Sequence, residues 1–579
     1  MTESISVMED GLRKSLWLVG LFVGVYLLPL NTRPLAIPDE MRYAEISREM
    51  LLTGDFVVPR LNGLRYFEKP AGGHVLNAIA LAIFGETNFA VRLMSALAIG
   101  LSAVAVYFFL KSYHSKQTAA LAVLIFLTSA EVMGVGTFSV LDSMLSCFVT
   151  LSLCSFYPAL AASGKKRIAW LALAGCFAGG AFLVKGFIAF AVPVVVIIPY
   201  LMLRGRWKDI LTLPWVPLAA ASAVSLPWAL AINRQEPDFW RYFFWEEHIR
   251  RFFSRSNAQH PYPFWFYIPV FVGGTIPWSL VGSMPLRDLV RKRCSDPLIQ
   301  FGFVWMVLPF LFFSCSSGKL GTYILPCFAP FAILLAVALM DRFECQHQNR
   351  SLQNGVRLNG LIVILSLATT FVVGGLQASG QIPLLDEHVV SKTIGWVIGL
   401  SAALLFVFGA VRDHHGPRKP VLLGLSAAAI FVTATVCTPT EISSSLGIQR
   451  TLESDQHLIQ PDTIIVANLK TVHAVCYVYK RDDVYLLNDQ GELQYGLSYP
   501  EAQHRLLDTT QLCTMIKQRG SQRVYLSLRS DPEDPFREEL PVPDSQRQWH
   551  NIWFAVYEPE REAEPELETE PTTEPDVDT

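Results

Sequence analysis

The chain has 579 residues, of which 51% are hydrophobic, with a mean hydropathy of +0.34 and a formal net charge of −3 at pH 7. Soluble domains seldom have this composition, and long runs free of charge indicate transmembrane helices. We therefore expect membrane lipids as partners and no nucleic acid, and we expect a monomer.

Apolar segments predict about thirteen membrane spans, several of them near the ~20 residues that a bilayer core needs. They lie at residues 16–30, 88–110, 118–135, 143–163, 168–184, 187–203, 211–232, 264–284, 298–316, 321–340, 357–377, 392–411 and 420–438. The predicted fold class is mainly α: a polytopic membrane protein of about 13 transmembrane helices with exterior amphipathic loop helices and a small C-terminal α/β periplasmic domain.

Basic residues set the expected orientation. Clusters such as Lys165-Lys166-Arg167 recur after every second span, and the positive-inside rule places those loops in the cytoplasm. An odd number of spans then places the C-terminus outside the membrane.

Two exterior loops hold more basic residues than this rule favours. Because Arg and Lys make charge-assisted bonds to phosphate oxygens, the loops predict an exterior phosphate ligand. The alternative is that these residues contact lipid headgroups or nearby acids. The residues are Arg33, Arg42, Arg48, Arg60, Arg65 and Lys69 in the first loop, and Arg241, Arg250, Arg251 and Arg255 in the second.

The first loop begins with Pro38-Asp39-Glu40. Asp39 precedes a helical pattern and is a candidate helix N-cap. It shares a helix face with Arg42 and Tyr43 by i, i+3, i+4 spacing, which suits a ligand with a sugar and a phosphate.

Later in the same loop comes Arg65-Tyr66-Phe67-Glu68-Lys69-Pro70. A residue before proline favours extended backbone, so Glu68 and Lys69 are expected to point to opposite sides. One side chain can then face a phosphate while the other meets a metal or a base. A surface ion pair is the alternative.

Two further ionisable residues lie at the outer ends of spans. Asp142 opens a long apolar helix, and carboxylates beside membrane segments are functional candidates, although helix capping is an equal alternative. Lys185 is interpreted as a snorkelling lysine.

The second exterior loop contains Trp245-Glu-Glu-His-Ile-Arg-Arg-Phe252, in which His248 and Arg251 share a helix face. His248 and Glu68 together are a candidate pair of ligands for a divalent cation such as Zn²⁺. Lys319 and Tyr323, at i, i+4 in a later outer turn, are either a ligand pair or a membrane-interface anchor.

The composition changes beyond Thr440. Strands are predicted at 463–467, 474–479, 483–487 and 523–528, and a helix is predicted at 500–520. The expected domains are therefore 1–439, 440–557 and an acidic tail, 558–579, which carries ten acids and one Arg and is predicted to be disordered. The sequence leaves open whether Cys476 and Cys513, both in this region, form a disulfide.

Taken in order, these motifs resemble the bacterial aminoarabinose transferases that modify lipid A. The resemblance rests on Pro-Asp-Glu-x-Arg-Tyr, Gly-Leu-Arg-Tyr-Phe-Glu-Lys-Pro, Leu-Asp, Glu-His-x-x-Arg-Phe and Lys-Leu-x-Thr-Tyr-Ile-Leu-Pro. That family belongs to the GT-C superfamily of lipid-linked-sugar glycosyltransferases and is similar to the protein O-mannosyltransferases.

The resemblance implies thirteen helices, an exterior catalytic cavity and a periplasmic C-terminal domain. It implies undecaprenyl phosphate bearing 4-amino-4-deoxy-L-arabinose as donor and a lipid A phosphate as acceptor. Asp39 matches the leading catalytic carboxylate, Asp142 a second acidic residue, and Glu68 with His248 a metal pair. The candidate donor-phosphate ligands are Lys69, Arg42, Arg251, Tyr323, Tyr66 and Lys319.

Residues 71–75, Ala-Gly-Gly-His-Val, depart from the aromatic-ended run of the family, which leaves the sugar and the acceptor open. A related transferase that acts on another glycan or on protein is the first alternative. A lipid-linked-sugar transporter would instead require ionisable groups near mid-membrane and broken helices in corresponding halves. A sensor with an exterior partner-binding domain would leave the basic first loop unexplained.

Overall fold

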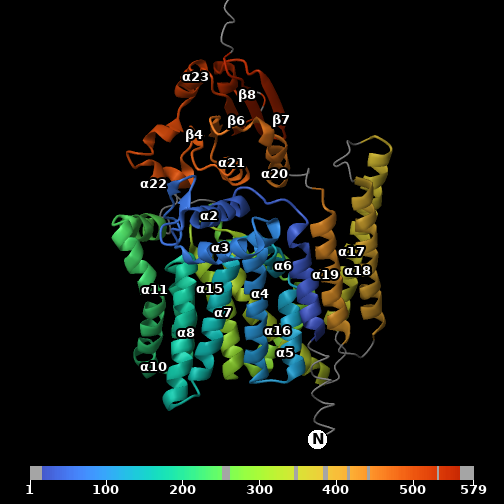
Figure 1. The fold of residues 1–579 in the computed structure, drawn as a ribbon. Coiled ribbons are helices and arrows are strands. Elements are labelled where there is room, and N and C mark those ends of the chain that lie inside the picture. The colour runs from blue at the N-terminus through green and yellow to red at the C-terminus, as the bar shows by residue number, and fades with distance from the viewer. Residues whose placement is uncertain are drawn as a thin grey trace, which may run out of the picture.

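The computed structural model describes residues 16–250, 261–344, 350–381, 389–413, 418–439, 444–530, 532 and 534–560. Figure 1 shows a bundle of long helices with two helices, α2 and α3, lying across one end and a C-terminal sheet stacked beyond them. The exterior elements are therefore held between the bundle and the sheet.

Nine helices of the described ranges are long and apolar enough to cross a membrane. They are α4 (Asn88–Lys111), α7 (Leu141–Ala159), α8 (Gly164–Lys185), α10 (Trp207–Thr212) with α11 (Trp215–Gln235), α15 (Pro297–Cys315), the turn Gly321–Cys327 with α16 (Phe328–Glu344), α17 (Arg350–Ala378), α18 (Val389–Arg412) and α19 (Arg418–Cys437).

Two bent pairs bring this number to eleven if each is one span. They are α5 (Lys116–Leu127) with α6 (Ala130–Gly136), bent by 66°, and Phe264–Gly274, which includes α13 (Tyr267–Gly274), with α14 (Ser279–Arg293), bent by 105°. The two other predicted spans fall on shorter apolar helices, Leu16–Asn31 and α9 (Ile188–Leu203). All the predicted segments thus contain helix, whereas a total of thirteen spans stays a prediction.

The two bent pairs contact each other at their breaks. The backbone N–H of Ala130 donates to the carbonyl of Ile276 at 3.1 Å, and the indole N–H of Trp278 donates to the hydroxyl of Thr128 at 3.1 Å. A helix break leaves backbone groups without intrahelical partners, and burying them unpaired is costly. Each break therefore supplies hydrogen-bond partners to the other.

The first exterior loop folds into α2 (Asp39–Thr53), the hairpin β1 (Arg60–Leu61) and β2 (Leu64–Arg65), and α3 (Gly72–Phe84). Helix α2 ends at Gly54, whose φ of +69° is a conformation that glycine adopts without strain. In the second exterior loop, the helix Arg241–Arg250 follows α11.

The C-terminal unit is built on a six-stranded sheet of order β5-β4-β3-β6-β8-β7, in which the first four strands are parallel. The strands are β3 (Ile464–Ala467), β4 (Tyr485–Leu487), β5 (Leu506–Leu507), β6 (Val524–Arg529), β7 (Ser545–Trp549) and β8 (Ile552–Tyr557). The helices are α20 (Ser444–Ser454), α21 (Val472–Tyr479), α22 (Gln494–Leu497), α23 (Thr509–Lys517) and α24 (Phe536–Glu539).

The structure corrects two predictions in this unit. The segment predicted as a strand at 474–479 is helix α21, because a short apolar run gives no periodicity that separates a strand from a buried helix. The helix predicted at 500–520 is only α23, which begins after a capping box formed by Asp508 and Gln511. Strands β5, β7 and β8 were not predicted.

Cys476 and Cys513 are both free thiols. The Cys476 side chain is buried against the Asn62 side chain at 3.4 Å, and the Cys513 thiol donates to the carbonyl of Glu539 at 3.0 Å. The disulfide that the sequence left open is therefore not formed.

Candidate functional site

Asp39 is the first residue of α2 and lies at the exterior end of the bundle. The N-cap position belongs to Pro38, and no side chain caps the helix, so the capping interpretation of Asp39 is wrong. The Asp39 carboxylate lies 3.2 Å from the Arg42 guanidinium and keeps 44% of its side chain exposed. It is thus an accessible carboxylate with a neighbouring cation.

The adjacent residue, Glu40, is fully buried and fixes the start of α2. Its carboxylate accepts hydrogen bonds from Arg92 at 2.6 and 2.8 Å, from Arg33 at 2.8 Å and from the backbone N–H of Ser139 at 3.0 Å. Burial opposes its ionisation, but Arg92 and Arg33 outweigh burial and hold the pKa of Glu40 at about 2. This ion cluster ties α2 to α4 and to the loop before α7, and it leaves Asp39 facing outward.

Lys69 connects the two exterior loops. Its ammonium lies 2.7 Å from the Glu247 carboxylate, in the helix Arg241–Arg250, and donates to the carbonyl of Glu68 at 2.8 Å. The carboxylate of Glu68 lies 3.9 Å from the same ammonium. The prediction that Glu68 and Lys69 point to opposite sides is therefore wrong. The two side chains form an ion pair, as the alternative expected, but the pair is largely buried and does not lie at the surface.

Asp142 and Tyr323 meet through Lys185. The Asp142 carboxylate accepts from the Lys185 ammonium at 2.5 Å, and this ammonium lies 4.6 Å from the centroid of the Tyr323 ring. Asp142 lies in the first turn of α7, whose N-cap is Val140, so Asp142 does not cap the helix. Lys185 was interpreted as a snorkelling lysine, whereas its ammonium is the centre of this cluster.

Lys319 has a different environment from the one predicted for a phosphate ligand. Its side chain is buried, and its ammonium donates to the carbonyls of Ser316 at 2.5 Å and Tyr262 at 3.0 Å. These bonds join the outer turn before α16 to the chain that precedes α13. Lys319 therefore has at least one structural role.

Arg42 and Tyr66 both contact a residue of the C-terminal unit that the sequence did not single out. The carboxylate of Glu492 lies 2.8 Å from Arg42 Nε and 2.8 Å from His473 Nε2, and the hydroxyl of Tyr66 donates to it at 3.4 Å. Glu492 is distant in sequence, and only the docking of the C-terminal unit on α2 brings it to Arg42.

His74 lies between the two phenols of the site. Its ring centroid is 5.7 Å from that of Tyr43 and 6.3 Å from that of Tyr66. The side chain is fully buried, and neither ring nitrogen has a hydrogen-bond partner among the described residues. Burial first, and then Lys69 and Arg42, lower the pKa of His74 to about 3, so the imidazole is neutral at physiological pH.

The metal pair stays a prediction. The side chain of His248, and Arg251 as a whole, lie outside the described residues. Within the part of the chain that the structure describes, no group of three or more His, Cys, Asp or Glu side chains could hold a metal ion. The ammonium of Lys69 lies 3.9 Å from the Glu68 carboxylate, and a cation at Glu68 would have this ammonium as a neighbour.

Four of the five arginines singled out in the first exterior loop pair with acids, as one part of the alternative interpretation expected. Arg33 pairs with Glu40, Arg42 with Asp39 and Glu492, Arg48 with Glu45, and Arg65 with Glu236 and Glu501. A ligand phosphate would therefore enter a network in which charges are already paired.

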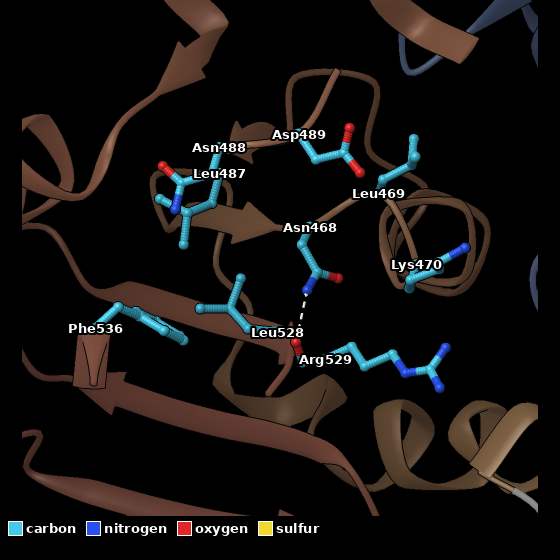
Figure 2. Close-up of a pocket in the computed structure, with 9 residues that line it drawn as sticks. All are labelled: Asn468, Leu469, Lys470, Leu487, Asn488, Asp489, Leu528, Arg529 and Phe536. Atoms are coloured by element: carbon cyan, nitrogen blue, oxygen red, sulfur yellow. Dashed lines mark hydrogen bonds between the residues drawn. The ribbon is translucent and has the colours of Figure 1, made fainter. Parts of the chain in front are cut away.

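A separate cavity of about 200 Å³ lies in the C-terminal unit (Figure 2). It is lined by residues just beyond β3 and β4 and at the end of β6, where ligands of parallel sheets usually bind. The side-chain amide of Asn468 donates to the carbonyl of Arg529 at 3.0 Å and so joins the ends of β3 and β6. The cavity shares no lining residue with the ionic groups on α2.

Comparisons with known proteins cover most of the chain. Residues 12–243 match the family model of dolichyl-phosphate-mannose-protein mannosyltransferases, and residues 448–556 match that of the C-terminal domain of the arabinosyl transferase ArnT. Among curated proteins, an undecaprenyl phosphate-alpha-4-amino-4-deoxy-L-arabinose arabinosyl transferase of Aeromonas salmonicida is 39% identical, over 93% of this chain and 97% of its own. The protein of the same description from Shewanella sediminis is 37% identical, over 93% of this chain and 96% of its own.

The fold is also similar to a solved structure. The crystal structure of ArnT from Cupriavidus metallidurans bound to undecaprenyl phosphate has a TM-score of 0.78 and 22% sequence identity, and the match covers 93% of this chain and 97% of that one. The apo form of the same protein gives a TM-score of 0.77. Bundle, exterior helices and C-terminal sheet are therefore a shared architecture.

Proposed function

Because the chain belongs to the family of undecaprenyl phosphate-alpha-4-amino-4-deoxy-L-arabinose arabinosyl transferases, we propose that it transfers 4-amino-4-deoxy-L-arabinose from undecaprenyl phosphate to a phosphate of lipid A. The observation that supports a transferase site is the group of charged side chains beside membrane helices: Asp39 with Arg42, Lys69 with Glu247, and Asp142 with Lys185. A lipid-linked donor is amphipathic. Membrane helices suit its undecaprenyl chain, and the charged side chains suit its sugar and phosphate.

In the proposed reaction the anomeric carbon of the sugar loses its bond to the undecaprenyl phosphate oxygen and gains one to an acceptor oxygen. The bonding electron pair leaves with undecaprenyl phosphate, whose charge therefore grows. Lys69 and Arg251 would stabilise this charge, with Arg42, Tyr66, Lys319 and Tyr323 as further candidate donor-phosphate ligands. In the present structure Glu247 lies against the Lys69 ammonium, so a donor phosphate has to compete with this carboxylate.

The acceptor decides the role of Asp39. A phosphate monoester, with a second pKa of about 6, is largely ionised near neutral pH and needs little deprotonation. Asp39 would then orient the donor or stabilise positive charge that develops on the sugar ring, with Asp142 as the second catalytic carboxylate. A hydroxyl acceptor would instead require Asp39 as general base.

A divalent cation held by Glu68 and His248 stays part of the proposal, but we derive no step through it, because the side chain of His248 lies outside the described residues. The transporter alternative expected broken helices, and two bent pairs are present. Their breaks contact each other, with Glu131 of α6 beside Gly274 at this contact, and the chain's relatives are transferases, which favours the enzyme. The enzyme is proposed to act as a monomer, with site and C-terminal unit on the periplasmic face.

Mass spectrometry of lipid A tests the proposal. The host makes the aminoarabinose donor, lacks its own transferase and receives this chain, its Asp39→Ala variant or its Glu86→Gln variant. We expect an added aminopentose with the wild type and with Glu86→Gln, and a loss of at least about 100-fold with Asp39→Ala, in the range that positioned catalytic groups contribute. Unmodified lipid A with a folded wild-type chain would contradict the proposed donor or acceptor.

A further inference from the structure

One short stretch of the C-terminal unit, Gly491–Glu501, contacts both exterior loops, and we call it the bridging segment. It pairs with Arg42 and Arg65 of the first loop and packs on Tyr242 of the second. It consists of the 3-10 turn Gly491–Leu493, helix α22 and the following residues. In Figure 1, α22 lies at the side of the sheet that faces the bundle. The bridging segment is therefore placed to influence the transferase site.

Glu492 is the ionic contact of this segment. Only 6% of its side chain is exposed, and its carboxylate lies 2.8 Å from both Arg42 Nε and His473 Nε2. Burial opposes its ionisation, but Arg42 and His473 outweigh burial and hold the pKa of Glu492 at about 2. Glu492 is thus a buried anion that needs the Arg42 guanidinium as its counter-ion.

Arg42 is shared between two carboxylates. While its Nε faces Glu492, another nitrogen of the guanidinium lies 3.2 Å from the Asp39 carboxylate. Asp39 is 44% exposed, whereas Glu492 is buried, so Glu492 is the rigid partner that determines where the planar guanidinium lies. Without Glu492, Arg42 is free to turn its full donor edge to Asp39.

The remainder of the bridging segment packs on residues that lie near Lys69 and Glu247 in the chain. The Tyr495 ring lies 5.1 Å from that of Phe67, two residues before Lys69, and 4.3 Å from that of Tyr242, in the helix that carries Glu247. A Cβ at Gly496 would lie only 2.8 Å from the carbonyl of Arg65. Backbone therefore packs on backbone here, which makes the contact rigid.

We infer that Glu492 is a positioning residue of the transferase site, through which the C-terminal unit sets the orientation of Arg42 and Asp39. The inference rests on the proposed function and extends it, since it makes the C-terminal unit part of the site's wall. Glu492 acts on the reacting groups first through Arg42, and its charge also attracts Lys69 across a longer distance.

The test is steady-state transfer by the purified full-length chain in lipid vesicles, with undecaprenyl phosphate-linked aminoarabinose and lipid A. Glu492→Gln keeps the side-chain shape and removes the charge. We expect kcat to fall by about 100-fold, the effect of a displacement of about 1 Å at a catalytic group. The KM for the donor should rise less than kcat falls, because Glu492→Gln turns Arg42, a candidate donor-phosphate ligand, without removing its charge.

Glu86→Gln is the matched control. Glu86 is also a carboxylate that pairs with a residue of the C-terminal unit, Lys480, but the pair is exposed and does not involve Arg42. Exposed pairs contribute little, so kcat should stay within about twofold of the wild type. Glu492→Asp, which keeps the charge on a shorter side chain, should recover part of the activity lost in Glu492→Gln.

Three results would overturn the inference: a folded Glu492→Gln enzyme with wild-type kcat, an equal loss of kcat in Glu86→Gln, or a loss confined to donor KM. If Glu492→Gln does not fold, Glu492→Asp decides, and a folded Asp variant with unchanged kcat overturns the inference. A wild-type chain without transfer contradicts the proposed function instead, so the two failures are distinguishable.

Discussion

At the scale of the residue, neighbours in sequence have opposite environments. Asp39 is 44% exposed beside Arg42, while Glu40 is fully buried between Arg33 and Arg92. Removing one partner from a buried ion cluster costs about 3–5 kcal/mol because a charge is left unpaired. The buried cluster of Glu40 therefore stabilises the start of α2, and this leaves Asp39 available for a substrate.

His74 makes the stability of the protein sensitive to acid. In the folded protein the pKa of His74 is about 3, whereas an unburied histidine has a pKa of 6.5. Burial lowers it most, followed by the charges of Lys69 and Arg42. Below pH 6.5 the unfolded chain takes up a proton that the folded chain refuses, so the free energy of unfolding falls as the pH falls, by at most about 1.4 kcal/mol per pH unit. The unfolding temperature, measured between pH 7.5 and pH 5, should therefore decrease as the pH falls.

The comparison for this prediction is His74→Gln, which keeps a polar side chain that does not titrate. Its unfolding temperature should decrease less between pH 7.5 and pH 5 than that of the wild type. Parallel curves for the two proteins would show that other groups, and not His74, cause the acid sensitivity.

At the scale of the element, the Asp142–Lys185 pair joins two helices, and nothing in the sequence indicated that these two residues pair. It links the start of α7 to the end of α8 and lies against Tyr323 in the turn Gly321–Cys327. Close packing supports this arrangement further along α8, where a Cβ at Gly175 would lie 2.3 Å from the carbonyl of Pro217 and one at Gly179 would lie 2.7 Å from the carbonyl of Ala221. Small residues thus let α8 approach α11.

A double-mutant cycle separates the structural from the catalytic part of this pair. Asp142→Asn and Lys185→Met each leave a buried charge without its partner. Each should therefore lower the free energy of unfolding by about 3–5 kcal/mol, and with it the unfolding temperature. The double variant should recover most of that stability, because both charges are gone. Transfer activity should stay at least about tenfold below wild type in all three, as expected of a positioned acidic group.

This experiment has two informative failures. An active double variant would remove Asp142 from the catalytic residues and leave the ion pair a purely structural feature. Single variants with wild-type unfolding temperatures would contradict the burial-based account of the pair.

At the scale of the whole molecule, the exterior loop and the C-terminal unit share one apolar core. That core contains Leu35, Ile46 and Leu64 from the loop together with Val475 and Leu493 from the C-terminal unit. Burial of such side chains contributes about 1.5–3 kcal/mol each. The two parts of the chain therefore stabilise each other, and the bridging segment is held against the site.

The orientation of the molecule gives the last prediction. Alkaline phosphatase, which is active only in the periplasm, is fused after Glu560 or after Arg206, in a loop with a basic cluster. The positive-inside rule predicts activity of the first fusion and none of the second. Inactivity of the Glu560 fusion, with the chain inserted and intact, would contradict a periplasmic C-terminal unit.

Much of the fold was predictable because membrane helices carry a strong local signal. All the predicted apolar segments contain helix in the structure, since uncharged runs must satisfy their backbone groups internally. The C-terminal unit was less predictable: 474–479 became a helix, and the two-residue β5 and the polar β7 had no clear pattern. The apolar run of β8 does have the pattern of a strand, and the prediction missed it. There, packing against the rest of the sheet decides the structure of runs that are locally ambiguous.

The sequence by itself determined the membrane class, the family resemblance and the exposed carboxylate Asp39, because these depend on composition and on residues close together in the chain. Only the tertiary structure decided the partners: Glu247 for Lys69, Lys185 for Asp142, and Glu492 for Arg42. Each of these contacts joins residues tens to hundreds of positions apart. Ion pairing acts through distance in space, and spacing along the chain carries no signal of it until the helices and the sheet have packed.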